Sequence, residues 1–435
     1  MSLCETPALD QFASHAVVFD RYLSCSPEVH SVLRSMSEGV HPSGSTENPV
    51  QTPDDIQGWL ALTNRRSLFI TDCRAVSETQ WADRFSESLL IEASVDESPS
   101  NEDDEDQQDP QTVAREVDQD AWMETRLAQF IGEALVELSD RQEDSDGLPD
   151  VIWLHLSGLT SAWDAPYEYR LALCDEDDPR PSYSQEPVSF QVNKTTDLDE
   201  VFQAMCAASG QAKLIDHLWS WIDAYIEQLP DRAQLAVLLA GIRGYPLGEH
   251  GCVGLRDDSC NEETNAGFRI PHSELVHVPL IVQPGFLPLG YRTGRLTQSM
   301  AIRGFVEEWL NDAEDGLTTS QIAELGLLGH NKPPIFLEDD TGEGESCWIE
   351  SFPYESIYTR YWAAIFDSAK GDVTRIYLMP DDRWQQNDVL NRVAEVADAM
   401  IDLRSQWLQW KIDSRANVGA TIPKPEPSDS LREPV

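Results

Sequence analysis

Few residues of this 435-residue chain have the type and spacing that chemistry requires. Its nine histidines show no metal-ligand spacing, and its eight cysteines include no CxxC pair. Without paired spacing, a zinc ribbon or a disulfide framework is not expected, and we predict free thiols in a reducing compartment. Two acidic pairs lie next to turn residues and are expected to be solvated loops: Asp339–Asp340 and Asp381–Asp382.

Common catalytic motifs are also absent from the sequence. There is no G-x-S-x-G elbow, no phosphate-binding G-x-x-x-x-G-K-[ST] loop, no G-x-G-x-x-G after a strand and no H-E-x-x-H helix. The composition also restricts the classes of binding partner. The sequence holds 77 acidic and 31 basic residues, which gives a net charge of -46. A chain of this charge has no electrostatic footprint for nucleic acid or an anionic membrane surface.

The N-terminal segment and the apolar runs bear on localisation. No apolar run approaches the about 20 residues of a membrane span, and the first residues lack the basic and apolar regions of a signal peptide. We therefore expect a cytoplasmic protein, or an extracytoplasmic one if translation starts further upstream.

The secondary-structure elements that would position a functional site alternate between predicted strands and predicted helices. Short, nearly continuous apolar runs at 67–71, 151–156, 235–239 and 276–282 predict strands of a buried, parallel sheet. Amphipathic patterns at 122–138, 214–229 and 388–410 predict helices. This alternation indicates an α/β sandwich with a mostly parallel central sheet.

Two segments look non-globular. Residues 94–120 hold 11 acids and almost no large apolar side chain, so we expect a disordered acidic loop. The proline-containing tail at 414–435 is expected to be disordered as well. The predicted organisation is an α/β domain over 1–330, a C-terminal subdomain over 331–413 and the tail.

In chain order, several segments resemble the sulfatase family of the alkaline-phosphatase-like superfamily. Residues 6–19 are similar to the family's TPNLDRLAAEGVVF segment, and Cys25-Ser-Pro27 follows at the place of its C-x-P-S-R motif. Leu247-Gly-Glu-His-Gly251 and Val278-Pro-Leu-Ile-Val282 match two later segments. The resemblance implies the alkaline-phosphatase/sulfatase-like sandwich, with helices flanking its sheet and a small C-terminal α+β subdomain.

The family reaction, as the resemblance implies it, is sulfate-ester hydrolysis by a formylglycine made from a cysteine, with a calcium ion clamping the sulfate. Cys25 occupies the nucleophile position, but Glu28 and Val29 stand where the maturation signal has Ser and Arg. The Glu28 charge repels an anionic substrate and disfavours a thiolate. We therefore expect Cys25 to remain an inert, unmodified thiol.

The metal and anion positions differ from the family pattern too. Ile242 and Arg243 align with a calcium-binding pair of the family, an Asp followed by His or Asn. The strand that carries the family's other pair, two carboxylates, would precede Met1, so no metal cofactor is expected. Asp72 and Arg74 align with the lysine and histidine of the anion site. The histidine expected near 159–163 is missing, and His155 before it is interpreted as structural. Arg256 or Arg269 could replace a later lysine.

Two functional hypotheses follow. The first is a sulfatase-like pseudoenzyme with a binding or regulatory role, whose partner is a small anion or an active paralogue. In it, Asp72, Arg74 and Arg243 line a degenerate pocket, and Glu249 and His250 belong to a hydrogen-bonded turn. The alternative is an active sulfuric or phosphoric ester hydrolase that uses calcium and starts further upstream. A plain acidic scaffold is a third possibility.

Overall fold

A computed structural model of the chain describes residues 4–42, 56–93, 121–230, 232–255, 270–285, 290–314, 346–416 and 431. The chain forms two compact units. The first unit comprises Met1–Leu9, Arg65–Pro187 and Leu198–Glu227, and the second comprises Asp10–Asn64, Val188–Asp197 and Gln228–Val435. The acidic segment 94–120, the boundary predicted at residue 330 and most of the tail lie outside the described residues.

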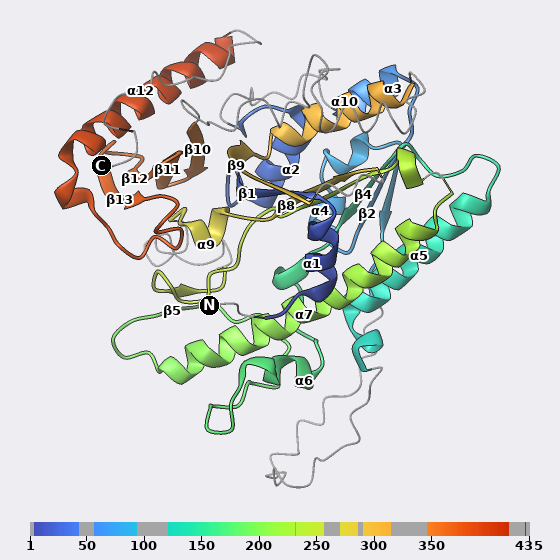
Figure 1. Cartoon of the computed structure of the whole chain (residues 1–435), viewed down its shortest axis with the longest axis horizontal. Coiled ribbons are helices and arrows are strands. Elements are labelled where there is room, and N and C mark those ends of the chain that lie inside the picture. The colour runs from blue at the N-terminus through green and yellow to red at the C-terminus, as the bar shows by residue number, and fades with distance from the viewer. Residues whose placement is uncertain are drawn as a thin grey trace. The chain divides into compact units, whose positions relative to one another are not determined.

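The first unit is built on a three-stranded parallel sheet in the order β3-β2-β4. Its strands are β2 (Ser67–Thr71), β3 (Glu87–Leu90) and β4 (Val151–His155), which confirms two of the predicted strands. Helices α5 (Arg126–Glu143) and α7 (Leu198–Gln228) belong to the same unit (Figure 1). Side chains of β2, α5 and α7 pack together in one hydrophobic core, which includes Leu68, Ile70, Phe130, Ile131, Leu214 and Leu218.

The other face of β2 carries aromatic side chains, because successive strand residues point to opposite faces. Phe69 packs against Trp81 and Phe85, with ring centroids 5.1 and 5.2 Å away. Trp153 of β4 contacts Trp81 at 5.2 Å. Every residue of β2 is buried, as the apolar run predicted. Short helices complete the unit: α4 (Arg74–Ser77), α6 (Tyr167–Arg170) and the 3₁₀ turn Leu171–Leu173.

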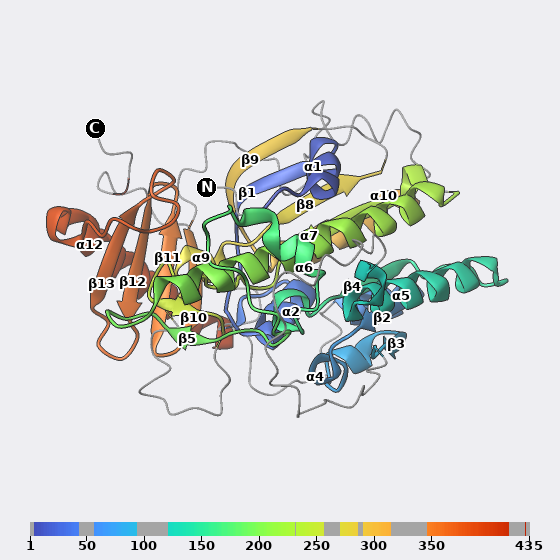
Figure 2. The same cartoon turned by 90° about the horizontal axis from the view of Figure 1, so that it is seen from below.

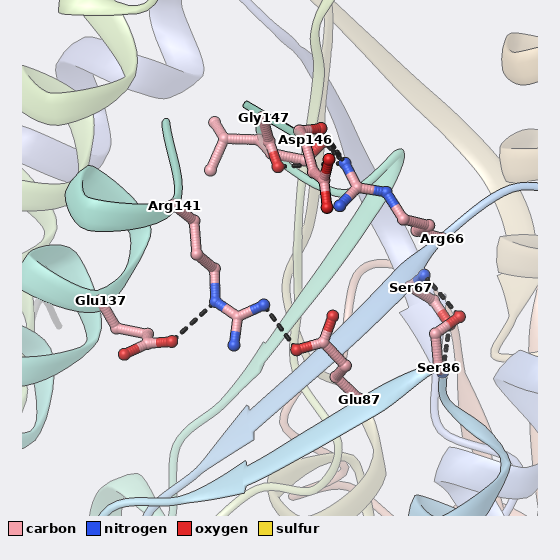
Figure 3. A network of polar contacts seen from close by, with 9 residues as sticks. Arg66, Ser67, Ser86, Glu87, Glu137, Arg141, Asp146 and Gly147 are labelled. Carbon is pink, nitrogen blue, oxygen red and sulfur yellow. Dashed lines mark hydrogen bonds and ion pairs between the residues drawn. The ribbon is translucent and has the colours of Figure 1, made fainter. Parts of the chain in front are cut away.

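Polar contacts fasten the edges of this sheet (Figure 3). Arg141 of α5 pairs with Glu87 of β3 at 2.6 Å and with Glu137 one helical turn away at 2.7 Å. Arg66 donates to the carbonyl oxygens of Asp146 and Gly147 at 2.6 and 3.0 Å. The Arg141–Glu87 pair links α5 to the edge strand β3, and the hydrogen bonds of Arg66 hold the turn that leads into β4.

The second unit contains a four-stranded mixed sheet in the order β6-β8-β1-β9. Its strands are β1 (Val17–Leu23), β6 (Ala236–Ala240), β8 (Leu280–Pro284) and β9 (Tyr291–Gln298). β1 runs parallel to β9 and antiparallel to β8. The sheet of the first unit is parallel, whereas two of the three described strand pairs of this sheet are antiparallel. β6 is a terminal strand, and its residues are only half-buried.

Five helices and two short strands precede, separate or follow these four strands in the sequence. They are α1 (Pro7–Ser14), α2 (Val29–Glu38), α3 (Ile56–Leu62), α9 (Ser273–Val276), α10 (Ala301–Glu314), β5 (Phe190–Gln191) and β7 (Cys252–Val253). The strand predicted at 276–282 begins four residues later, because the backbone N–H groups of Leu275 and Val276 donate to His272 O in the turn of α9.

The C-terminal part of the second unit is a small α+β arrangement, as the fold prediction expected. Strands β10 (Ser346–Ser351), β11 (Tyr354–Thr359), β12 (Trp362–Asp367) and β13 (Val373–Leu378) form an antiparallel meander. Helix α12 (Ala394–Ala416) lies against it (Figure 2). Their shared core includes Trp348, Phe366, Met400 and Trp407. Among the described residues, no helix is long and apolar enough to cross a membrane.

Candidate functional site

Cys25 lies in the short loop between β1 and α2 and is completely buried. Its N–H donates to Ser299 Oγ at 3.4 Å. Burial raises the pKa of the Cys25 thiol to about 11, against the smaller opposing effect of hydrogen bonds from Ser35 and Ser299. The thiol is therefore protonated at neutral pH, and the residue has no surface exposed to solvent.

The segment that follows β6 meets this loop. Ser24 Oγ donates to Ile242 O at 2.6 Å, and Arg243 Nη1 donates to Pro27 O at 3.4 Å. Arg243 thus contacts the loop that carries Cys25. Ile242 contributes only its carbonyl oxygen, which Ser24 already binds, and Arg243 adds a permanent positive charge.

These two residues do not fit a calcium ion. Calcium requires six to eight oxygen ligands, mostly from carboxylates and carbonyls, and the side chains of Ile242 and Arg243 supply none. Within the part of the chain that the structure describes, no group of three or more His, Cys, Asp or Glu side chains is arranged to hold a metal ion. We therefore assign no step to a metal at this position.

Helix α9 joins the two segments through backbone contacts. Ser24 N–H donates to Val276 O at 2.8 Å, and Gly244 N–H donates to Leu275 O at 2.8 Å. The backbones approach so closely that a Cβ at position 244 would lie 2.0 Å from Glu274 O. Only glycine fits there, so Gly244 fixes the course of the chain just after Arg243.

A buried polar cluster extends from α9 and was not predicted from the sequence. The ring of His250 stacks on that of His272, with centroids 3.6 Å apart and planes 5° apart. His250 Nδ1 lies 3.1 Å from Glu274 Oε1, and Arg375 Nη1 lies 2.6 Å from His272 Nε2. The interpretation of His250 as a turn residue missed these partners, which lie 22 to 125 positions away in the sequence and carry no motif.

The partners shift the pKa values of the two stacked rings in opposite directions. His272 Nε2 faces the Arg375 guanidinium, which only donates, so this nitrogen must accept and the ring is neutral. Burial and the nearby charges of His250 and Arg375 lower the pKa of His272 to about 3. His250 instead faces two acceptors, Glu274 Oε1 and Gln385 O, and its pKa is raised because these contacts outweigh burial. Burial raises the pKa of Glu274 to about 7.

Asp72 and Arg74 belong to the first unit, where each has a local structural partner. Asp72 Oδ1 accepts from Ser157 N–H at 2.8 Å and from Ser157 Oγ at 2.9 Å. Burial raises the pKa of Asp72, although the Ser157 contacts oppose the shift. Arg74 is exposed and pairs through two nitrogens with the carboxylate of Glu92. The two side chains thus support the loops after β4 and β3 within their own unit.

The remaining residues singled out in the sequence are less informative. His155 is buried, and its Nδ1 lies 2.8 Å from Thr71 Oγ1 on the neighbouring strand. Burial lowers the pKa of His155 to about 4, which fits the structural interpretation. Arg256 and Arg269 lie outside the described residues.

The fold has counterparts among solved structures. The structure aligns over 96% of this chain with a protein in complex with its substrate D-glucosamine-2-N,6-O-disulfate, at a TM-score of 0.60, 13% identity and 94% of that chain. The chain has the sulfatase fold. A 2-O GAG sulfatase aligns over 99% of this chain and 91% of its own, at a TM-score of 0.54 and 12% identity.

The sulfatase fold is shared with other ester hydrolases. The phosphonate monoester hydrolase of Agrobacterium radiobacter aligns over 95% of this chain and 92% of its own, at a TM-score of 0.58 and 12% identity. No family model matches the sequence, and no significant match was found among curated proteins. The likeness is therefore one of fold, and activity has to be argued from the residues of this chain.

Proposed function

We propose that this chain is a binding or regulatory module on a sulfatase fold and that it lacks sulfuric ester hydrolase activity. The observation that carries the proposal is the state of Cys25. A thiol whose pKa is about 11 is a thiolate in only about one molecule in ten thousand at pH 7. A buried, protonated sulfur is a poor nucleophile.

Two neighbours of Cys25 support the same proposal. Glu28 is exposed directly before helix α2, three residues after Cys25, where its charge repels an anionic ester. Arg243 contacts Pro27 O from the position where ester hydrolysis would need a hard cation. A guanidinium holds an anion but does not lower the pKa of a bound water or supply a nucleophile, as a metal ion does.

As the ligand we propose a small oxyanion held by Arg243. A guanidinium presents several N–H donors in a plane and matches the geometry of sulfate, phosphate or carboxylate. The test is thermal unfolding with sulfate or phosphate against chloride at equal ionic strength. A ligand that binds only the folded state raises the melting temperature with concentration. The shift should be absent in Arg243→Gln; an equal shift in this variant would refute the assignment to Arg243.

The maturation state of Cys25 can be measured separately. Because Glu28 and Val29 replace the maturation signal, the peptide containing residue 25 should have the mass of an unmodified cysteine in protein from its native source. A peptide with the mass of formylglycine would refute the proposal.

The alternative is an active ester hydrolase. The observation in its favour is that the structure aligns along more than nine-tenths of its length with a 2-O GAG sulfatase and a phosphonate monoester hydrolase. The turnover measurement described at the end of the Discussion separates the two candidates.

A further inference from the structure

The first unit contains two thiols in contact. Cys174 Sγ lies 3.4 Å from Cys206 Sγ, and both cysteines are free. Cys174 follows the 3₁₀ turn Leu171–Leu173 and is half-buried, whereas Cys206 lies on α7 and is fully buried. We infer that these two thiols form a reversible disulfide when the protein meets a hydroperoxide. This inference does not depend on the function proposed above.

Backbone packing fixes the approach of the two sulfurs. Arg170 and Cys174 are four residues apart, as are Cys206 and Gly210 on one face of α7. A Cβ at position 210 would lie 2.9 Å from Arg170 N, so the segment before Cys174 touches the helix at a second point. The turn and the helix are therefore held in register one helical turn apart, and closing the S–S bond requires mainly side-chain rotation.

The side chain of Arg170 secures this segment. Arg170 is buried, and its Nη1 donates to the carbonyl oxygens of Ser182 and Ser184 at 2.6 and 2.8 Å. Its Nη2 donates to Trp163 O. The loop that carries Cys174 is thus anchored at several backbone positions, and the thiol cannot easily leave its partner.

The chemistry balances with one hydroperoxide per disulfide. The thiolate of the more accessible Cys174 attacks one peroxide oxygen, the O–O bond breaks, and the sulfur becomes a sulfenic acid. Cys206 sulfur then attacks the Cys174 sulfur, the S–O bond breaks, and water leaves. With hydrogen peroxide, two thiols and one peroxide give one disulfide and two waters, and both electrons pass to the peroxide oxygens.

The surroundings determine which oxidant works and how fast. Four acidic residues follow Cys174 directly: Asp175, Glu176, Asp177 and Asp178. Their charge repels anionic glutathione disulfide but not neutral hydrogen peroxide. Burial, together with the contact with Cys174, raises the pKa of Cys206 to about 12. Closure is therefore expected to be slow at neutral pH and to speed up as the pH rises.

The test uses the full chain, hydrogen peroxide, alkylation of the remaining thiols and peptide mapping without reductant. We expect one cross-linked pair joining Cys174 to Cys206, restored to two alkylatable thiols by dithiothreitol. Glutathione disulfide at equal concentration should form the pair at least about tenfold more slowly, because of the acidic run. Cys174→Ser should lose the cross-link and leave Cys206 alkylatable on unfolding, whereas Cys73→Ser, a half-buried thiol of the same unit, should keep it.

Three results would overturn the inference. The first is that Cys174 and Cys206 both remain alkylatable after peroxide treatment. The second is that Cys174 is oxidised to the sulfinic acid without a cross-link, and the third is that Cys206 joins a different cysteine in the intact protein. Because each result is obtained with the chain that carries no substitution, none depends on whether a serine variant folds.

Discussion

His250 and His272 stack at 3.6 Å with nearly parallel rings, yet their pKa values move in opposite directions. Stacking alone would treat the rings alike, so the difference comes from their partners. His250 meets the Glu274 carboxylate, and His272 meets the Arg375 guanidinium. The cluster therefore holds one proton between His250 and Glu274, and the ring of His272 stays neutral.

The neutral ring predicts acid sensitivity. His272 has a folded pKa of about 3, far below the ordinary value of 6.5, so the unfolded chain binds the extra proton first. The stability from keeping His272 neutral is complete above pH 6.5 and is lost as the pH falls toward 3. It changes by about 1.4 kcal/mol per pH unit within that window. Urea unfolding at several pH values should show this slope reduced by about the same amount in His272→Gln; an unchanged slope would contradict the assignment.

The ring of His250, whose pKa is raised, gives a second prediction. Glu274→Gln removes the carboxylate 3.1 Å from His250 Nδ1, so the pKa of His250 should fall. NMR titration of the imidazole resonances measures the change directly. Glu307→Gln is the control, since Glu307 lies on α10 and pairs with Arg303 at 2.8 Å. Equal shifts in the two variants would mean that general charge, rather than the contact, sets the pKa.

Gly244 and Gly132 provide a matched pair of glycines. Gly244→Ala places a Cβ 2.0 Å from the backbone oxygen of Glu274 and should destabilise the second unit by about 2 kcal/mol or more. Gly132 lies inside α5 with nothing within 4 Å of an added Cβ. Gly132→Ala should therefore stabilise the protein by about 0.5–1 kcal/mol through helix propensity. Thermal unfolding checks both, and a neutral Gly244→Ala would contradict the close approach after Arg243.

Arg141 should make a measurable but salt-dependent contribution. Its two carboxylate partners raise the pKa of its guanidinium, and they connect α5 with β3 (Figure 3). Because the pairs are partly exposed, Arg141→Ala should cost about 0.5–1 kcal/mol at low salt and less at high salt. Arg74→Ala, which breaks a fully exposed pair with Glu92, should have the smaller effect in the same denaturation assay. A larger loss of stability in Arg74→Ala than in Arg141→Ala would show that the ion pair between α5 and β3 contributes little.

Much of the fold could be predicted because its signals are local. The apolar runs at 67–71 and 151–156 became β2 and β4 with little change, since each run ends at polar residues. Helix α5 begins at Arg126 rather than at 122, because Thr125 caps it by accepting from Ala128 N–H. A capping residue of this kind changes where a helix begins, but the helix predicted from the sequence is still formed.

The polar cluster could not be predicted, because its members meet only through tertiary folding. His250, His272 and Gln385 lie on three loops far apart in the sequence, and Gln385 joins them by accepting from Ser273 N–H and lying 3.1 Å from His272 Nδ1. The contact of Arg243 with the Cys25 loop was predictable only from the family resemblance. No spacing within this sequence links positions 25 and 243.

Turnover of aryl sulfates and aryl phosphates tests the central claim most directly, with calcium, magnesium or zinc supplied in turn. A buried, protonated Cys25 next to Arg243 predicts that the purified full chain releases no more phenol than its Cys25→Ala variant under any of these conditions. Metal-dependent release that Cys25→Ala abolishes would contradict the account and identify an active ester hydrolase.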